Sequence, residues 1–349
     1  MGSVKEMKKL VKMVTTVGLS IGLLAGHASV EAAGKNYTYY SYGDTANVTK
    51  STTYGVNLMG GSTDVDEAML WMAKKANGGD FVVLRASGSD GYNQYLYDLA
   101  AQNGAGLNSV ETIVLNNRNA ASDSFVLDKV SKAEAVFFAG GDQSLYVNYI
   151  KDTPLEDTLN NLISINKVPI GGTSAGLAIQ GQFVYDAANG SVYSDEALSN
   201  PGNRYMTFTR NFLSNPYLTS TITDSHFEQR DRMGRFVGFM ARNIMDGWTT
   251  QAKGIAVNEQ TALLLEADGS AKVVSQPGST NAAVYVGRTT SAPTSSLSSP
   301  LTMKDIEMTK LKTGDTFSFS NWSSSNGFQY KLNAQNGVLT STTGNIYGN

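Results

Sequence analysis

Residues 167–182 read KVPIGGTSAGLAIQGQ, and this stretch joins a short apolar run to a segment whose apolar residues recur at helical spacing. Ser174 stands at the junction, with Gly172 and Gly176 two residues away on either side. The arrangement is that of a nucleophile elbow, a strained strand-to-helix turn that exposes a serine hydroxyl above a sheet. The elbow predicts a serine nucleophile. A purely structural turn is the alternative interpretation, because glycine and serine are common residues.

Strands and helices alternate along the chain from about residue 55 to about residue 250. Continuous apolar runs such as DFVVLRA, VETIVL and AEAVFFAGG predict buried strands, and segments with helical spacing lie between them. This alternation predicts a parallel sheet covered by helices on both faces. Such sheets bind ligands at the carboxyl ends of their strands, where three glycine pairs fall: Gly60–Gly61, Gly140–Gly141 and Gly171–Gly172.

The first 33 residues have the three parts of a secretory signal peptide. A start rich in lysine precedes an apolar, uncharged run at residues 13–25, and small residues follow up to Ala33. A membrane anchor is the alternative, but the apolar run is shorter than the roughly 20 residues that a spanning helix needs. We therefore expect a secreted, extracellular protein that has no stable membrane association.

Composition limits the chemistry of the site. The chain of 349 residues has no cysteine and only two histidines, and one of these, His27, lies within the predicted signal peptide. A thiol nucleophile, a cysteine-bound metal and a cluster of histidine ligands are therefore excluded, whereas a calcium site made of carboxylates is not. The net charge of −3, with both signs mixed along the chain, argues against nucleic-acid binding. We expect no cofactor, and the oligomeric state stays open, a homodimer included.

His226 is the histidine that can serve as the base for a serine nucleophile. It lies in ITDSHFEQRDRMGRF, where carboxylates and arginines crowd a short stretch, as they do in a polar pocket and also around a solvated helix cap. A third group must orient its imidazole ring. Asp195 and Glu196 lie in SVYSDEALSNP between the serine and the histidine, and both are candidates for this role.

Four motifs carry a resemblance to a known family. In chain order they are FFAGGDQ, GGTSAG, SDEAL and DSHFEQRDRMGR, and together they make the chain similar to the cyanophycinases, whose relatives include the aspartyl dipeptidase peptidase E. The resemblance covers about residues 55–290. It implies an α/β fold with a parallel sheet in a flavodoxin-like or class I glutaminase-like three-layer sandwich, and a triad in the order serine, acid, histidine.

The resemblance also implies roles for individual residues. Ser174 would be the nucleophile, His226 the general base and Glu196 the acid of the triad. The backbone N–H groups of Gly141 and Ala175 would form the oxyanion hole, and no residue is assigned to a metal. Six further positions match the family's substrate pocket: Gln143, Asp224, Ser225, Arg230, Arg232 and Arg235.

Two details bear on the substrate. Ser225 stands where cyanophycinases that degrade storage granules typically carry glutamine, so their β-aspartyl-arginine substrate does not carry over directly to this chain. The arginines at positions 230, 232 and 235 cannot all face one pocket from a single regular helix, because they lie on different sides of it. Either the segment begins irregularly or one arginine is structural, and Arg232 is the candidate for the structural role.

These observations predict a secreted serine-type peptidase, an exopeptidase or isopeptidase that hydrolyses aspartyl or β-aspartyl bonds in a peptide or polymer. A secreted esterase of the α/β-hydrolase type shares the elbow but does not explain the AGGDQ motif or the arginines. A non-catalytic binding protein on the same fold is the other alternative. We expect a signal peptide at residues 1–33, a catalytic domain at 34–290, and a linker with a C-terminal β-rich extension at 291–349.

Overall fold

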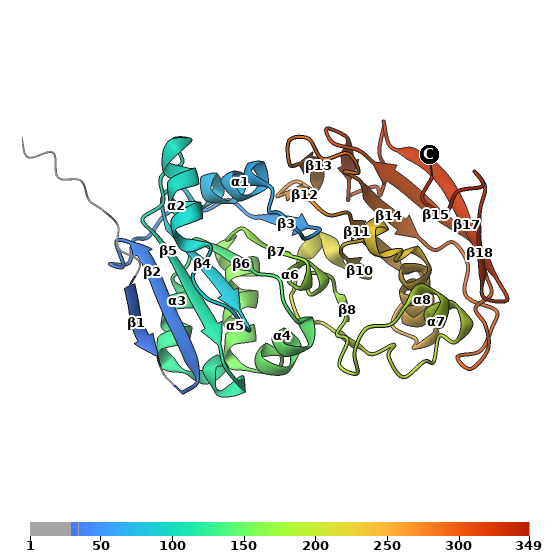
Figure 1. Cartoon of the computed structure of the whole chain (residues 1–349), viewed down its shortest axis with the longest axis horizontal. Helices are drawn as coiled ribbons and strands as arrows, with labels where there is room; N and C mark the ends of the chain where they lie inside the picture. Colours follow the sequence, from blue (N-terminus) through green and yellow to red (C-terminus); the bar gives the residue numbers. More distant parts are fainter. Residues whose placement is uncertain (1–28, 34, 349) are drawn as a thin grey trace, which may run out of the picture.

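The computed structural model describes residues 29–33 and 35–348, with side chains placed from residue 35 onward. The predicted signal peptide therefore lies outside the described residues up to residue 28, and its last part, Ser29–Ala33, forms strand β1. The chain folds into two sheets that lie side by side in Figure 1. Within the described residues, we find no helix with the length and apolar character needed to cross a membrane.

The first sheet has parallel strands at its centre, in the order β5-β4-β6-β7-β3. Successive residues of a strand point to opposite faces, so Val82 and Leu84 join one apolar core while Phe81 and Val83 join another. Helices α1 and α2 cover one face, and α3, α4 and α5 cover the other (Figure 1). The predicted α/β fold with covered sheet faces is therefore confirmed.

The elements of this first sheet have the following bounds. Besides β1, which pairs with β2 at one edge, its strands are β2 Tyr37–Gly43, β3 Gly55–Met59, β4 Asp80–Arg85, β5 Ser109–Leu115, β6 Ala135–Phe138, β7 Ile170–Thr173, β12 Thr261–Glu266, β13 Ser270–Ser275 and β16 Thr316–Ser318. Its helices are α1 Asp66–Ala76, α2 Asn93–Gln102, α3 Ser124–Ser131, α4 Gln143–Ile150 and α5 Pro154–Asn161.

The second sheet also contains neighbouring parallel strands, because β10 pairs in parallel with both β8 and β11. Helices α7 and α8 pack on one of its faces over a second apolar core. Helix α8 runs from Met233 to Met245 and begins after an irregular segment. The bounds are α7 Ser194–Ser199, α8 Met233–Met245, β8 Phe183–Tyr185, β9 Phe208–Arg210, β10 Thr221–Asp224, β11 Lys253–Val257, β14 Val284–Arg288, β15 Met303–Leu311, β17 Phe328–Gln335 and β18 Val338–Ser341.

The C-terminal segment adds strands to both sheets. Strands β15, β17 and β18 extend the second sheet beyond β14, while β16 pairs with β13 at the edge of the first. Side chains of both sheets, such as Leu263 and Ile255, meet in one shared core. The extra C-terminal strands expected from the sequence are therefore present, and they are built into the sheets.

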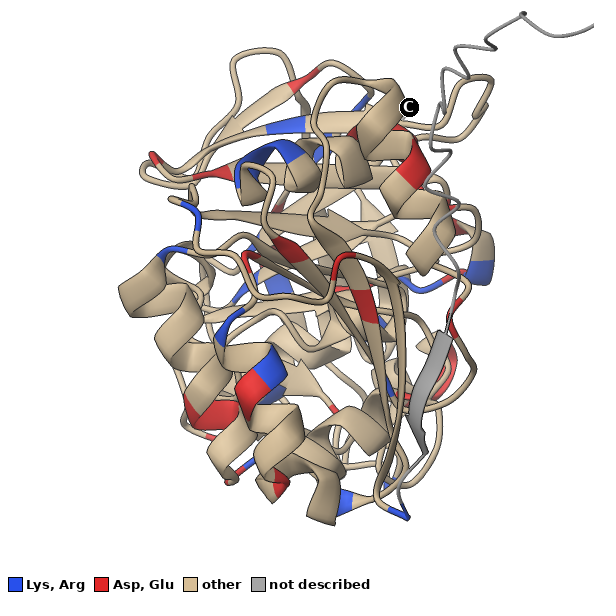
Figure 2. Cartoon of the chain, turned by 90° about the vertical axis from the view of Figure 1, so that its left-hand side faces the viewer, with Lys and Arg blue, Asp and Glu red and all other residues tan. Residues whose placement is uncertain are grey.

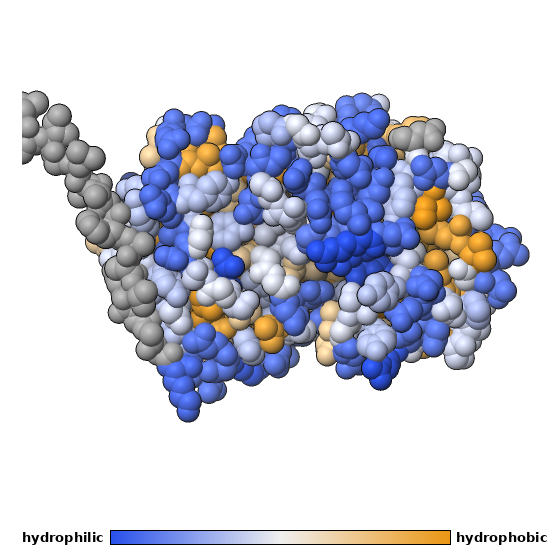
Figure 3. Space-filling model, in the orientation of Figure 1, coloured by the Kyte–Doolittle hydropathy of each residue, from blue (hydrophilic) through white to orange (hydrophobic). Residues whose placement is uncertain are grey.

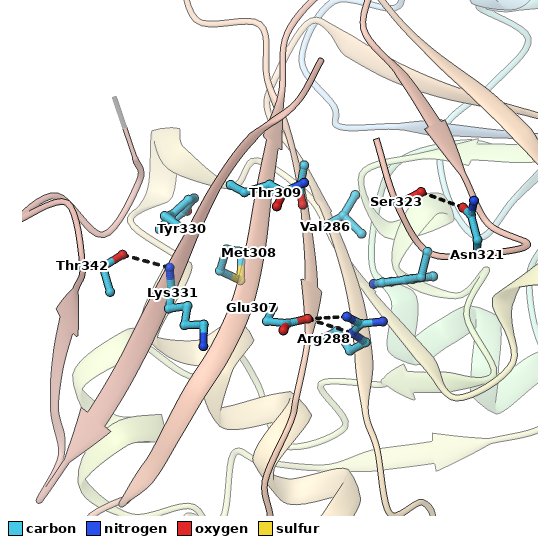
Figure 4. Close-up of a pocket in the computed structure, with 12 residues that line it drawn as sticks. Val286, Arg288, Glu307, Met308, Thr309, Asn321, Ser323, Tyr330, Lys331 and Thr342 are labelled. Carbon is cyan, nitrogen blue, oxygen red and sulfur yellow. Dashed lines mark hydrogen bonds and ion pairs between the residues drawn. The ribbon is translucent and has the colours of Figure 1, made fainter. Parts of the chain in front are cut away.

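A cavity of about 590 Å³ lies on the outer face of the second sheet, over β14, β15 and β17. Arg288 and Glu307 point toward each other across its floor (Figure 4), and Arg288 Nε donates to Glu307 Oε2 at 3.0 Å. The Lys331 ammonium group pairs with Asp305 at 3.3 Å. The charges of this cavity thus neutralise one another, and none of the predicted site residues lines it.

The surface of the molecule mixes charges and apolar residues in small areas. Acidic and basic residues are interspersed on the side shown in Figure 2. The face shown in Figure 3 is largely hydrophilic, with apolar residues in small separate patches. The exposed large apolar side chains among the described residues are Ile165, Tyr193, Leu297, Phe328 and Val338.

Candidate active site

Ser174 occupies a strained corner between β7 and helix α6 (Ala175–Ala178). Its φ is +55° and its ψ is −111°, a conformation that residues other than glycine rarely adopt. A Cβ on Gly172 would lie 2.4 Å from the carbonyl carbon of Gly176, and a Cβ on Gly176 would lie 2.1 Å from the Phe138 oxygen. Both flanking glycines are therefore required by close backbone approach, as an elbow demands.

His226 follows β10 and lies against the end of β3, where the two sheets meet. Its backbone N–H donates to the Gly60 carbonyl at 2.8 Å, and a Cβ on Gly61 would lie 2.4 Å from the ring atom Nε2. The same Nε2 is 2.7 Å from Oγ of Ser174. The predicted nucleophile and the predicted base are therefore in direct hydrogen-bond contact.

The carboxylate beside His226 is not the predicted Glu196. His226 Nδ1 is 2.6 Å from Oε1 of Glu259, which follows strand β11. Glu196 instead lies in the first turn of α7, where its Oε2 accepts a hydrogen bond from the N–H of Tyr193 at 2.9 Å. Its carboxylate satisfies a donor that the start of a helix leaves unpaired, and it is committed to that cap.

Asp195, the other predicted candidate, is also separate from His226. Asp195 and Glu196 line an adjacent hollow, and neither lines the cavity that contains Ser174. The carboxylate thus follows the histidine in the chain, and the order is serine, histidine, glutamate. The sequence holds a signal for it, because the apolar run GIAV is followed directly by Asn258 and Glu259, which places Glu259 just after a strand, as Ser174 and His226 are.

The surroundings of His226 favour its neutral form. Burial lowers the pKa of the imidazole, and the nearby guanidinium groups of Arg230 and Arg232 lower it further, while the hydrogen bond to Glu259 opposes both effects. The net result is a pKa below the ordinary value for histidine. An ionised carboxylate can only accept a hydrogen bond, so Nδ1 of the neutral ring carries the proton and donates to Glu259. The other ring nitrogen, Nε2, then has a free lone pair that can accept the proton of the Ser174 hydroxyl.

The two N–H groups expected to form an oxyanion hole border the same cavity. Ala175 is the first residue of α6, and N–H groups at this position have no partner within their helix. Gly141 has a φ of +146°, in the region that favours glycine. Gly140 lies close to the nucleophile, since a Cβ on it would be 3.5 Å from Cβ of Ser174.

The structure brings all six predicted pocket residues to one cavity of about 280 Å³ beside Ser174. They are Gln143, Asp224, Ser225, Arg230, Arg232 and Arg235. The three arginines can share it because the segment begins irregularly: a short 3₁₀ turn, Glu228–Arg230, precedes α8, and Asp231 between them has a φ of +47°.

Asp224 and Arg235 form a buried bidentate ion pair at the cavity wall. Arg235 Nε donates to Oδ2 at 2.8 Å, Nη2 donates to Oδ1 at 2.5 Å, and both side chains are almost completely buried. The guanidinium carbon also lies 5.4 Å from the ring centres of Tyr185 and Phe239. Burial raises the pKa of Asp224, but Arg235 and then Arg232 outweigh it and hold that pKa below its usual value. The positive charge of Arg235 is therefore largely neutralised by Asp224.

Arg232 and Arg230 differ in how they are held. Arg232 Nη1 donates to the carbonyl of Ser225 at 2.7 Å and lies 3.5 Å from Asp224, and burial is the main cause that lowers its pKa to about 10. Arg230 is exposed, and within the described residues no carboxylate lies within 4.0 Å of its guanidinium group. Arg230 is therefore the arginine with a charge available to a ligand.

Comparisons with known proteins agree with the motifs. No family model matches the chain. It is 26% identical over 212 residues to the cyanophycinase of Trichormus variabilis, which covers 61% of this chain and 66% of that protein. It is 24% identical over 169 residues to the cyanophycinase of Geminocystis herdmanii, which covers 48% of this chain and 56% of that protein. In sequence, the chain is therefore similar to the cyanophycinases.

The chain spans about two thirds of the length of the relative from Trichormus variabilis. Among solved structures, a peptidase from an acI-B1 actinobacterium has a TM-score of 0.49 at 15% identity and covers 77% of this chain and 98% of its own. A putative peptidase E from Listeria monocytogenes has a TM-score of 0.41 at 13% identity and covers 65% and 99%.

Proposed function

We propose that this cyanophycinase relative is a serine-type peptidase with Ser174 as nucleophile, His226 as general base and Glu259 as the residue that orients the base. One observation carries the proposal: Ser174 Oγ, the two ring nitrogens of His226 and Glu259 Oε1 form a continuous line with contacts of 2.7 and 2.6 Å. Serine, histidine and a carboxylate in this arrangement are the parts of a hydrolytic triad.

The reaction follows from the protonation states. Neutral His226 takes the proton from Ser174 as Oγ attacks the carbonyl carbon of the substrate. The N–H groups of Gly141 and Ala175 stabilise the oxyanion that forms, and Glu259 stabilises the imidazolium. The imidazolium then gives its proton to the leaving amine. A water molecule activated in the same way by His226 releases the acyl group from the serine.

The charges of the cavity favour an acidic substrate. Three guanidinium groups line it against the two carboxylates of Asp142 and Asp224, and the Asp224 charge is already matched by Arg235. Arg230 offers a planar donor that suits a bidentate contact with a carboxylate. We propose that it binds the free carboxylate of an aspartyl or β-aspartyl residue whose other carbonyl is attacked by Ser174.

We also propose that the protein acts outside the cell on peptides or a polymer. The support is the signal-peptide pattern of residues 1–33, with its lysine-rich start, apolar run and small residues before Ala33. N-terminal sequencing of the protein recovered from the culture medium tests this location, and the expected first residue is Gly34.

The experiment that tests the activity combines a probe and a substrate screen. A fluorophosphonate should label the wild type and not Ser174→Ala, because it reacts with an activated serine. Mass spectrometry should then show cleavage of aspartyl dipeptides, β-aspartyl peptides or cyanophycin by the mature protein. Absence of labelling would favour a binding protein, and labelling with hydrolysis of simple esters alone would favour an esterase.

A further inference from the structure

The segment between His226 and helix α8 turns at a residue with a left-handed backbone. The 3₁₀ turn Glu228–Arg230 ends at Asp231, whose φ is +47°, and α8 begins at Met233. A residue other than glycine adopts this conformation at a cost, so contacts from elsewhere must hold it. Arg232 at the N-cap position gives the helix no side-chain cap. The arginine-bearing segment therefore depends on other parts of the chain.

Tyr347, which follows the last strand β18, supplies such contacts through a single hydroxyl. Its Oη donates to Oδ1 of Asp231 at 2.7 Å and accepts from the N–H of Met233 at 3.2 Å. The first N–H groups of a helix have no partner within it, so this hydroxyl acts as a cap from a distant part of the chain. The hydroxyl thus bonds the residue before Arg232 and the residue after it.

The ring of Tyr347 packs against two aromatic rings, one from this segment and one from strand β14. Its centre lies 6.0 Å from that of Phe227, the residue after the catalytic histidine, and 5.9 Å from that of Tyr285. The hydroxyl of Tyr285 donates to Oε2 of Glu228 at 2.8 Å. Tyr347 thus contacts Phe227, Asp231 and Met233, and its neighbour Tyr285 holds Glu228.

We propose that Tyr347 is a positioning residue for substrate recognition, which fixes the direction in which Arg230 presents its guanidinium group by holding Asp231 and capping α8. The inference rests on the proposed function, since it assigns to Arg230 the carboxylate of the substrate. It gives the C-terminal segment a part in specificity, although the lining of the Ser174 cavity includes none of its residues. The segment acts through the backbone that carries the arginine.

The variant Tyr347→Phe removes both hydrogen bonds and keeps the ring. We expect its KM for an aspartyl peptide to rise about tenfold, because a misplaced Arg230 loses a charge-assisted hydrogen bond to the substrate. The kcat should stay within about twofold, since Ser174 and His226 are untouched. The KM for the matched asparaginyl peptide should change by less than about twofold. Equal loss of kcat on both peptides, with both KM values unchanged, would overturn the proposal.

Tyr54→Phe is the matched control. It likewise removes one tyrosine hydroxyl, which donates to Oδ1 of Asn215 at 3.3 Å, but Tyr54 is buried in the core beside the first sheet, away from the segment at residues 227–233. We expect it to leave both KM values unchanged. A rise in the aspartyl KM equal to that of Tyr347→Phe would show a general loosening of the fold and would overturn the inference.

Hydrogen exchange over residues 228–236 tests the positioning without a substrate. The amides of the first turn of α8 should exchange at least about fivefold faster in Tyr347→Phe than in the wild type, and at the wild-type rate in Tyr54→Phe. Unchanged exchange in Tyr347→Phe would overturn the inference whatever the activity. Faster exchange in a protein whose wild type does not distinguish aspartyl from asparaginyl peptides would support the positioning and contradict the proposed function instead.

Discussion

The histidine of the site lies between one carboxylate and two arginines, and these neighbours act on its pKa in opposite directions. Burial and the guanidinium groups of Arg230 and Arg232 lower the pKa, and Glu259 raises it. The balance keeps the ring neutral near neutral pH, and in the proposed reaction the Glu259 carboxylate would stabilise the imidazolium. A base with these properties works at a pH below the ordinary pKa of histidine.

The pH dependence of kcat/KM follows from this balance. Activity needs neutral His226, so kcat/KM should rise with pH and reach half its plateau below about pH 6.5, the ordinary histidine value. Arg230→Gln removes a charge that lowers the pKa, so its midpoint should move to higher pH. Measured profiles for both proteins check this, and a wild-type midpoint above 6.5 or a downward shift in Arg230→Gln would contradict it.

A second prediction concerns the roles of Arg230 and Arg232. Arg230→Gln should lose roughly 1.5–3 kcal/mol in kcat/KM on aspartyl peptides and almost nothing on asparaginyl peptides. Arg232→Gln is the matched control, since its guanidinium group holds the Ser225 carbonyl, and it should weaken both substrates alike. Steady-state kinetics on the paired peptides decides. Equal losses on both peptides in Arg230→Gln would mean that this arginine binds no substrate carboxylate.

The close approach of helix α6 to strand β6 sets the geometry of the elbow. Gly176→Ala would place a Cβ 2.1 Å from the Phe138 oxygen, a backbone atom that cannot move aside. We expect a loss of about 3 kcal/mol or more in the free energy of unfolding. In the control Gly106→Ala the added Cβ meets no atom within 4 Å, and stability should hold or rise slightly. Urea unfolding measures both, and equal stability of the two variants would contradict this account of the elbow.

The elements also show what the sequence could predict. The elbow and the strand ends were predictable, because glycines at close contacts and apolar runs leave local patterns. Glu259 was not assigned, because it reaches His226 through the parallel pairing of β10 with β11, in which Asp224 lies opposite Ala256. His226 and Glu259 are 33 positions apart in the chain. The motif SDEAL, which lies between the serine and the histidine, instead pointed to Asp195 and Glu196. Pairing between strands is a long-range property that a local pattern does not carry.

At the scale of the whole molecule, the C-terminal strands complete both sheets. Five of their apolar side chains are at most 2% exposed: Met303, Ile306, Met308, Leu311 and Phe317. Burying each stabilises the fold by roughly 1.5–3 kcal/mol, and together this is comparable to the whole stability of about 5–15 kcal/mol of a typical protein. We therefore propose that residues 291–349 are part of the folding unit and do not form a separate domain.

Truncation tests this integration. A chain of residues 34–302 should show no cooperative thermal transition, because it lacks β15 and leaves the edge of β14 and the shared core exposed. The full mature chain should melt in one transition by circular dichroism. A truncated chain that melts cooperatively within a few degrees of the full one would show that the extension is dispensable for folding.

In the proposed mechanism Glu259, rather than Glu196, orients the histidine that activates Ser174. The most direct test is kcat/KM of Glu259→Gln and Glu196→Gln on one aspartyl peptide, since each variant changes a carboxylate to an amide of the same shape. We predict a loss of about 10⁴ for Glu259→Gln, as for other triads that lose their carboxylate. Glu196→Gln should stay within about threefold of the wild type, because it only weakens the cap of α7. Near-normal activity in Glu259→Gln together with a large loss in Glu196→Gln would contradict the account.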